Sequence, residues 1–287
     1  MSYIHSQSLF ADTEGDEMLR FASLGSGSSG NCYYLSHKGT RILIDAGVAP
    51  RTILQRLKSL SISMREISGI FVTHDHADHV RSVGLLATKY NIPVFASPEV
   101  AKVLINSRYI AEDLTPYINV IEVGVQMTIR DMEILTFEVP HDACQNVGYS
   151  ITTSAGVFSL ITDIGHINEE IRAAVSRSNF LVFESNYDPE MLSGGNYPEF
   201  LKLRITGGEG HISNKDAANF IAENYHMELK FLALCHLSKH NNHPDLAYKT
   251  MENRLFNEGI RVGKDLQLHV LGRSTASPLF ELEIEKF

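Results

Sequence analysis

Short apolar runs alternate with amphipathic segments along most of this chain. Apolar or alternating runs bounded by turn residues predict strands, and apolar residues spaced three and four apart predict helices. The expected strands are 19–24, 32–36, 41–45, 69–73, 92–96, 119–123, 132–139, 147–152, 157–162, 180–184, 229–235 and 266–271. The expected helices are 50–60, 80–90, 98–106, 168–176, 197–205, 213–225 and 245–257. This order predicts an α/β fold in which helices lie outside two sheets.

No repeat, low-complexity linker or block of charge divides the chain, so we expect one domain over residues 18–287. Residues 1–17 are polar and lack the basic and apolar regions of a secretory signal, which predicts a polar N-terminal extension. No apolar run approaches the roughly 18 residues that would span a membrane, so we expect no membrane association.

The densest group of chemically active side chains is Thr-His-Asp-His-Ala-Asp-His, at residues 73–79. It lies between an expected strand and an expected helix. Alternate residues of an extended segment point the same way, which directs His74 and His76 together, while Asp78 and His79 fall at the helix start. Imidazole and carboxylate are ligands that borderline divalent metals prefer. The motif therefore predicts a metal site rather than a polar loop.

Four further polar residues follow apolar runs that predict strands: Asp45, His141, Asp163 and His236. Any one of them alone would be typical of a solvated turn. Open α/β sheets, however, gather ligands at the carboxyl ends of their strands. We therefore expect these side chains to share one site with the histidine motif.

The number of ligands predicts two divalent ions, either Zn²⁺ or Mn²⁺. The expected ligands are His74, His76 and His141 for one ion, Asp78, His79 and His236 for the other, and Asp163 as the bridge. Asp45 is expected to orient a ligand histidine through its second ring nitrogen. Two ions about 3.5–4 Å apart can hold a substrate oxygen between them and generate hydroxide near neutral pH.

The charge and cysteine content limit the partners and the redox setting. A formal net charge of −9 argues against non-specific nucleic-acid binding driven by the field of the whole molecule. A local basic patch stays possible, and bound cations would invert the potential around them.

The chain has three cysteines, Cys32, Cys144 and Cys235. An odd number is not typical of a disulfide framework. We therefore expect the cysteines to be small buried hydrophobic residues in a reducing compartment.

The ligand positions, in this order, resemble the metallo-β-lactamase superfamily from about residue 19 onward. The resemblance implies a four-layer αβ/βα sandwich with two mixed β-sheets and outer helices, and a dinuclear site at one edge of the sheets. The chain departs from some branches. It has no cysteine among its expected ligands, His76 stands where the flavodiiron branch has glutamate, and there is no room for the long β-CASP insertion.

Four further stretches resemble the YycJ/WalJ family within this superfamily, namely residues 21–31, 197–205, 210–214 and 236–242. This resemblance implies a cytoplasmic bacterial phosphodiesterase that acts as a 5′-to-3′ exonuclease on DNA. No feature of the sequence indicates an obligate protein partner. Glu184 and His211 resemble the paired glutamate and histidine of tRNA-processing relatives, which implies that they protonate the leaving oxygen. Asp78 would take the proton of the attacking water while binding an ion.

Several residues could contact a phosphate or a base. Arg204 can bind phosphate through two nitrogens and Lys202 as a point charge, although such a pair is equally typical of a solvated helix face. Ser238, Asn241 and Asn242 could donate hydrogen bonds.

Two other functions stay open at this point. A thioester or lactone hydrolase resembling glyoxalase II would use the same seven ligand types. The segment with Lys202 and Arg204, together with the Glu184 and His211 pair, favours the nuclease. The third hypothesis is a catalytically silent subunit that binds nucleic acid, but such members usually lose ligands, and all seven candidates are present here.

Overall fold

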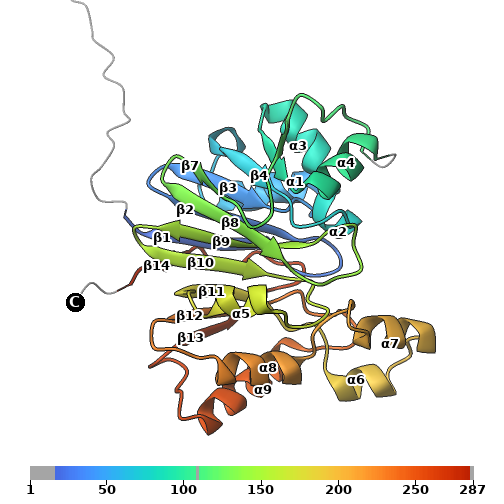
Figure 1. The fold of residues 1–287 in the computed structure, drawn as a ribbon, viewed down its shortest axis with the longest axis vertical. Helices are drawn as coiled ribbons and strands as arrows, with labels where there is room; N and C mark the ends of the chain where they lie inside the picture. Colours follow the sequence, from blue (N-terminus) through green and yellow to red (C-terminus); the bar gives the residue numbers. More distant parts are fainter. Residues whose placement is uncertain (1–16, 108–109, 285–287) are drawn as a thin grey trace, which may run out of the picture.

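The computed structural model describes residues 17–107 and 110–284. Two β-sheets lie face to face between two layers of helices (Figure 1). The expected four-layer sandwich is therefore confirmed. The expected N-terminal extension, residues 1–17, lies outside the described residues except for Glu17.

Each sheet combines antiparallel and parallel strands. The first has the order β14-β1-β2-β3-β4-β5-β6 and is parallel from β3 to β6. Its strands are β1 (Leu19–Gly25), β2 (Cys32–His37), β3 (Thr40–Ile44), β4 (Gly69–Phe71), β5 (Val94–Ala96), β6 (Ile118–Val120) and β14 (Phe280–Leu282). The second has the order β13-β12-β11-β10-β9-β8-β7 and is parallel from β10 to β13. Its strands are β7 (Gln126–Ile129), β8 (Met132–Glu138), β9 (Val147–Thr153), β10 (Gly156–Ile161), β11 (Phe180–Glu184), β12 (Phe231–Cys235) and β13 (Gln267–Val270).

Helices cover the outer face of both sheets (Figure 1). On the first sheet lie α1 (Pro50–Ser59), α3 (Val83–Tyr90) and α4 (Pro98–Asn106). On the second lie α5 (Glu169–Val175), α8 (Asn214–Glu223) and α9 (Pro244–Asn257). The short helices are α2 (Ala77–Val80), α6 (Pro189–Gly194) and α7 (Glu199–Thr206). No side chain of α7 is buried, so this helix lies at the surface and adds nothing to the core.

Three apolar layers hold the sandwich together. The middle layer, between the sheets, includes the fully buried rings of Phe21, Phe71 and Phe158. An outer layer lies between each sheet and its helices. Strands buried on both faces, such as β11 and β12, are apolar at nearly every position, which explains why their continuous runs could be read from the sequence.

All twelve expected strands and all seven expected helical segments are found, with shifted ends. The strands β7 and β14 were not predicted, and neither was α6. Both missed strands lie at sheet edges, where β7 has a mixed pattern of exposed and half-buried residues. Such short edge strands carry a weak apolar signal.

The helix expected at 80–90 is divided into α2 and α3 because tertiary hydrogen bonds interrupt it. The backbone N–H of Ser82 donates to the Ala46 carbonyl (2.8 Å), and its hydroxyl donates to the Val48 carbonyl (2.6 Å). The helix expected from Ser213 is confirmed as α8. Ser213 is its N-cap, and its hydroxyl oxygen accepts the N–H of Asp216 (3.0 Å).

The structure bears on the expected burial of the three cysteines and on the search for a membrane-spanning helix. Cys32 and Cys235 are buried as expected, but the same expectation is wrong for Cys144, which is exposed. Cys144 lies in the loop between β8 and β9 and belongs to none of the three apolar layers. Within residues 17–107 and 110–284, no helix is both long and apolar enough to cross a membrane.

Candidate metal centre

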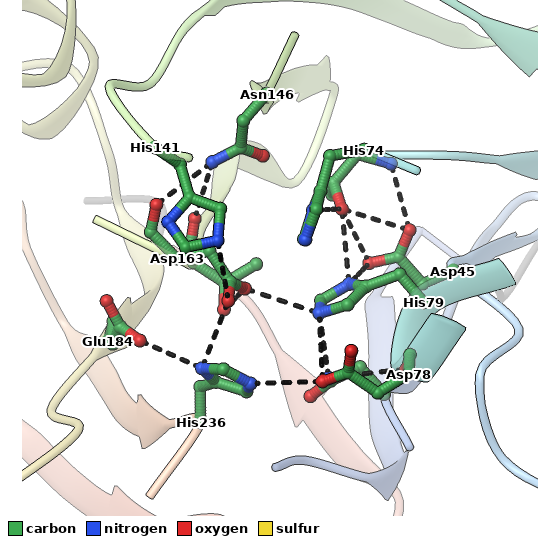
Figure 2. Close-up of polar contacts among 12 residues, drawn as sticks. Asp45, His74, Asp78, His79, His141, Asn146, Asp163, Glu184 and His236 are labelled. Carbon is green, nitrogen blue, oxygen red and sulfur yellow. Dashed lines mark hydrogen bonds and ion pairs between the residues drawn. The ribbon is translucent and has the colours of Figure 1, made fainter. Parts of the chain in front are cut away.

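Loops that follow strands of both sheets meet at one edge of the sandwich. Asp45 follows β3, His141 follows β8, Asp163 follows β10 and His236 follows β12, while the histidine motif follows β4. Figure 2 shows these side chains around a common centre. The structure therefore brings together the strand-end residues that the sequence singled out.

Three of these residues have an unusual backbone. Asp45, Asp163 and His236 adopt φ values of 59°, 59° and 54°, in the left-handed region that side chains other than glycine rarely occupy. Each of them stands at or just after a strand end and turns the chain there. Such conformations cost about 1 kcal/mol or more and persist where the surrounding structure enforces them, as at functional sites.

The ligand atoms form overlapping groups in which all atoms lie within 4.8 Å of one another. The groups are His74, His76 and His141; Asp78, His79 and His236; His74, His79 and Asp163; and Asp163, Glu184, His211 and His236. The first two groups match the two expected ligand sets. Asp163 lies between them, because it belongs to groups that include members of both.

The side chains present fit divalent metals, as three buried nitrogens indicate. Among the residues that the structure describes, Nε2 of His74, His141 and His236 is buried without a hydrogen-bond partner. Buried polar atoms are nearly always paired, since an unpaired one loses its hydration without compensation. Unpaired imidazole nitrogens grouped in this way are therefore suited to metal coordination.

The separations between ligand atoms agree with this interpretation. Nε2 of His79 lies 3.3 Å from Oδ2 of Asp163 and 3.7 Å from Oδ2 of Asp78. Nε2 of His236 lies 3.6 Å from Oδ2 of Asp78, and Nε2 of His141 lies 3.7 Å from Oδ1 of Asp163. Two ligands at about 2.1 Å from one tetrahedral ion are separated by about 3.4 Å, so these pairs have the spacing that a shared ion requires.

A neighbour holds the other ring nitrogen of His79 and that of His141. Nδ1–H of His79 donates to Oδ2 of Asp45 (2.7 Å), while Oδ1 of Asp45 accepts the backbone N–H of Thr73 (2.9 Å). Nδ1–H of His141 donates to the Gly210 carbonyl (2.9 Å). Asp45 therefore makes the contact expected from the sequence. Such contacts fix the tautomer and leave Nε2 for the metal.

The charges in the cluster also suit metal binding. Burial raises the pKa of Asp78 and of Asp163, but nearby imidazoles lower it further, so both pKa values lie below the usual range. Burial lowers the pKa of His74 and of His141, which keeps these rings neutral. Burial also lowers the pKa of His79, but Asp45 and Asp163 raise it to about 9, so an arriving metal must displace a proton there.

Glu184 joins two parts of the site. Its Oε1 accepts Nδ1–H of His211 (2.8 Å) and Nδ1–H of His236 (2.8 Å), while its Oε2 accepts the backbone N–H of Ile164 (2.6 Å). The sequence paired Glu184 with His211 alone, on the basis of the resemblance. The contact with His236 was missed because no spacing in the sequence indicates it.

A second missed residue is Asn31, at the end of the glycine-rich turn after β1. Its Nδ2 lies 2.9 Å from Nε2 of His79 and 3.4 Å from Oδ2 of Asp78. No role for Asn31 was predicted from the sequence, although a glycine-rich turn near a site is a usable signal. Gly47 allows the backbone at Asp78 to approach closely, because a Cβ atom at residue 47 would lie 1.6 Å from the Asp78 carbonyl oxygen.

The expected substrate contacts do not all lie together. Arg204 and Ser238 line a hollow of about 170 Å³ whose lining includes His211 and His236. The amine of Lys202 donates instead to the Ser193 carbonyl (2.7 Å), and Lys202 lines a different hollow.

The two asparagines expected to contact substrate, Asn241 and Asn242, are buried and do not line the first hollow. The amide of Asn242 donates to the backbone carbonyls of Ser185 and Asn186, which gives it structural partners. Asp142, missed in the sequence, fixes Arg204 through an ion pair of 2.5 Å.

The comparisons with known proteins agree on one family. Residues 40–232 match the model of a β-lactamase superfamily domain. The chain is 33% identical to exodeoxyribonuclease WalJ of Streptococcus pneumoniae, over 92% of this chain and 98% of that protein. It is 35% identical to exodeoxyribonuclease YycJ of Bacillus anthracis, over 88% of this chain and 94% of that protein.

Solved structures share the fold. The metallo-β-lactamase fold protein YhfI of Bacillus subtilis superposes with a TM-score of 0.68 at 15% identity, covering 92% of this chain and 99% of that one. At this level of identity the similarity concerns the architecture of the chain alone.

Proposed function

The chain belongs to the metallo-β-lactamase superfamily, and from this premise we propose that it is a metal-dependent exodeoxyribonuclease. What supports this most is identity of 33% and 35%, over nearly the full length of both partners, to two proteins named exodeoxyribonucleases. The ligand set alone would not separate a nuclease from a thioester hydrolase. A cytoplasmic location and a 5′-to-3′ polarity are further parts of the proposal, and both rest on the family resemblance.

The residues at the centre would hold two divalent ions, with Asp163 between the two sets of three ligands. When bound, such ions lower the pKa of a water molecule and neutralise charge on the phosphate in the transition state. Zn²⁺ and Mn²⁺ both suit imidazole and carboxylate ligands.

Asp78 is suited to accept the proton of the attacking water. Its side chain reaches the surface in part, and its carboxylate lies within 3.7 Å of two ring nitrogens. As the water oxygen bonds to phosphorus, the proton passes to Asp78. A carboxylate at this position can perform the transfer because it is ionised across the working pH range.

His211 is suited to give a proton to the leaving oxygen. Its Nδ1–H is held by the buried carboxylate of Glu184, which orients the ring. The ring is partly exposed and lines the hollow beside the ligands. As the bond from phosphorus to the leaving oxygen breaks, His211 supplies the proton that makes a neutral alcohol.

Arg204 and Ser238 are the substrate contacts that we propose, because both line the same hollow as His211. Arg204 carries a charge suited to a phosphate, and Asp142 holds its side chain in place. Lys202 and Asn241 remain candidates from the sequence, but their positions give them no contact with this hollow.

The proposal is tested with purified, metal-analysed protein and two substrates. One is a 5′-phosphorylated DNA duplex with an end label, and the other is a glutathione thioester. We expect two metal ions per chain and stepwise release of nucleotides from the 5′ end of the duplex. Hydrolysis of the thioester without any cleavage of DNA would overturn the proposal in favour of the glyoxalase-like alternative.

A further inference from the structure

The hollow next to His211 has one wall that the proposed chemistry does not use. Tyr197, Leu201 and Ile205 line it from the segment that begins helix α7 and from the helix itself. Leu201 and Ile205 are four residues apart, so they lie on the same face of that helix. Leu237, which follows the ligand His236, completes the apolar lining.

The size of this hollow corresponds to one planar ring. Its volume of about 170 Å³ is close to the roughly 150 Å³ of an engineered protein cavity that binds benzene. A single nucleobase is a flat ring system of this order of size, so the hollow has room for one base.

The position of the hollow indicates which nucleoside this is. Its lining includes His211, which we propose protonates the leaving oxygen, and His236, a proposed metal ligand. A group that enters the hollow is therefore attached to the leaving oxygen rather than to the retained strand. Arg204 lines the same hollow and offers a cation for the phosphate that the departing nucleotide carries on its own 5′ side.

We infer that this hollow is the subsite for the terminal nucleoside that the reaction releases, and that the ring of Tyr197 stacks on its base. The inference rests on the proposed nuclease function and adds the residues that hold the leaving nucleotide. Tyr197 is half-buried, and its ring lies 6.0 Å from that of His240 in an edge-on arrangement, which limits the orientations open to it. Stacking on an aromatic side chain accepts every base, since each has a π-face.

In the step itself, the water oxygen bonds to the phosphorus between the first and second nucleotides. The bond from that phosphorus to the 3′ oxygen of the first nucleotide breaks, and this oxygen takes a proton from His211. The product in the hollow is a mononucleotide that keeps its own 5′ phosphate. The shortened strand retains a new 5′ phosphate and can return for the next cycle.

The experiment compares three 5′-phosphorylated DNA strands on the full chain with its metals. One has a natural 5′ nucleotide, one has an abasic tetrahydrofuran residue at the 5′ end, and one has this residue at the second position. We expect wild type to cleave the natural end with a kcat/KM about tenfold above that of the abasic end, within the range for loss of one base–aromatic contact. The abasic residue at the second position should have little effect on the first cleavage.

Variants identify the ring that makes this difference. Tyr197→Ala should reduce kcat/KM for the natural end about tenfold, down to the level of the abasic end, and should leave the abasic end unchanged. Tyr197→Phe keeps the ring and should match wild type. Leu203→Ala is the matched control, because Leu203 lies six residues from Tyr197, on helix α7, but lines the other hollow. Equal losses of Tyr197→Ala on both ends, or equal cleavage of both ends by wild type, would overturn the inference.

A further measurement separates this inference from the proposed function. Deoxythymidine 5′-monophosphate should inhibit wild type about tenfold more strongly than Tyr197→Ala, while deoxyribose 5-phosphate should inhibit both alike. Equal inhibition of wild type by the two compounds would refute stacking. Failure to cleave any of the DNA strands would instead refute the nuclease function, and the subsite with it.

Discussion

Replacement of Glu184 by glutamine tests whether one carboxylate supports both the proton donor and a metal ligand. Glutamine has nearly the same shape but brings an NH₂ group in place of one oxygen. In the wild type, Oε1 accepts hydrogens from His211 and His236, and Oε2 accepts the N–H of Ile164. In either orientation of the amide, its NH₂ group therefore faces another donor.

The expected losses in rate and in metal affinity follow from these contacts. A hydrogen bond to a charged group contributes about 1.5–3 kcal/mol, and a buried donor left without an acceptor costs about 1–3 kcal/mol. A loss of about 3 kcal/mol corresponds to roughly a hundredfold in rate. Because His236 loses its partner as well, metal affinity should fall by about 10- to 100-fold, the usual effect of removing a group that supports a ligand histidine.

The assay measures kcat on end-labelled duplex DNA and, separately, metal affinity by titration against a chelating indicator. His211→Ala should slow turnover but keep its metal, because the His211 ring supports only the proton transfer. The exposed Glu170→Gln is the matched surface control and should match wild type in both assays. Should Glu184→Gln bind metal as tightly as His211→Ala does, the second role of Glu184 would be refuted.

Three other predictions follow from the site. Asp78→Ala should abolish hydrolysis while the far-ultraviolet circular dichroism spectrum stays unchanged, and retained activity in metal-defined buffer would contradict its role. Arg204→Ala should weaken DNA binding and lower the slope of log K against log salt by about one, whereas Lys202→Ala should leave both unchanged because its amine faces the Ser193 carbonyl; an equal effect of the two variants in a fluorescence-anisotropy titration would contradict the separation of their side chains. Removal of metal by a chelator should lower Tm by about 5 °C or more, since a ligand present at 100 times its Kd stabilises the folded state by about 2.7 kcal/mol; a Tm that calorimetry finds unchanged would argue against tight binding.

The sequence allowed most of the fold to be predicted because most strands are buried on both faces. The runs in β11 and β12 are continuous and apolar, and no amphipathic helix has that pattern. The edge strands β7 and β14 were missed for the opposite reason, since one side of each lacks a partner strand. The division of the helix at Ser82 depends on hydrogen bonds to a loop more than thirty residues away, which no local pattern encodes.

The ligand positions could be predicted because strand ends in such a fold meet at one edge. The contacts that support them could not, since Glu184 and Asn31 reach their partners across tens of residues. The pairing of Lys202 with Arg204 could have been refined from the sequence alone. Residues two apart on a helix point in directions about 200° apart, so the two side chains cannot face the same hollow once the segment is helical.

The left-handed backbone at Asp45, Asp163 and His236 restricts how this centre could be redesigned for another metal. β-Branched residues fit that conformation poorly. A glutamate would have to adopt the same backbone conformation, and its side chain is longer than that of aspartate. Asparagine tolerates the backbone, but it brings no negative charge. Engineers who wish to change the preferred ion therefore have more freedom at His74, His76 and His141, whose backbone lies outside that region.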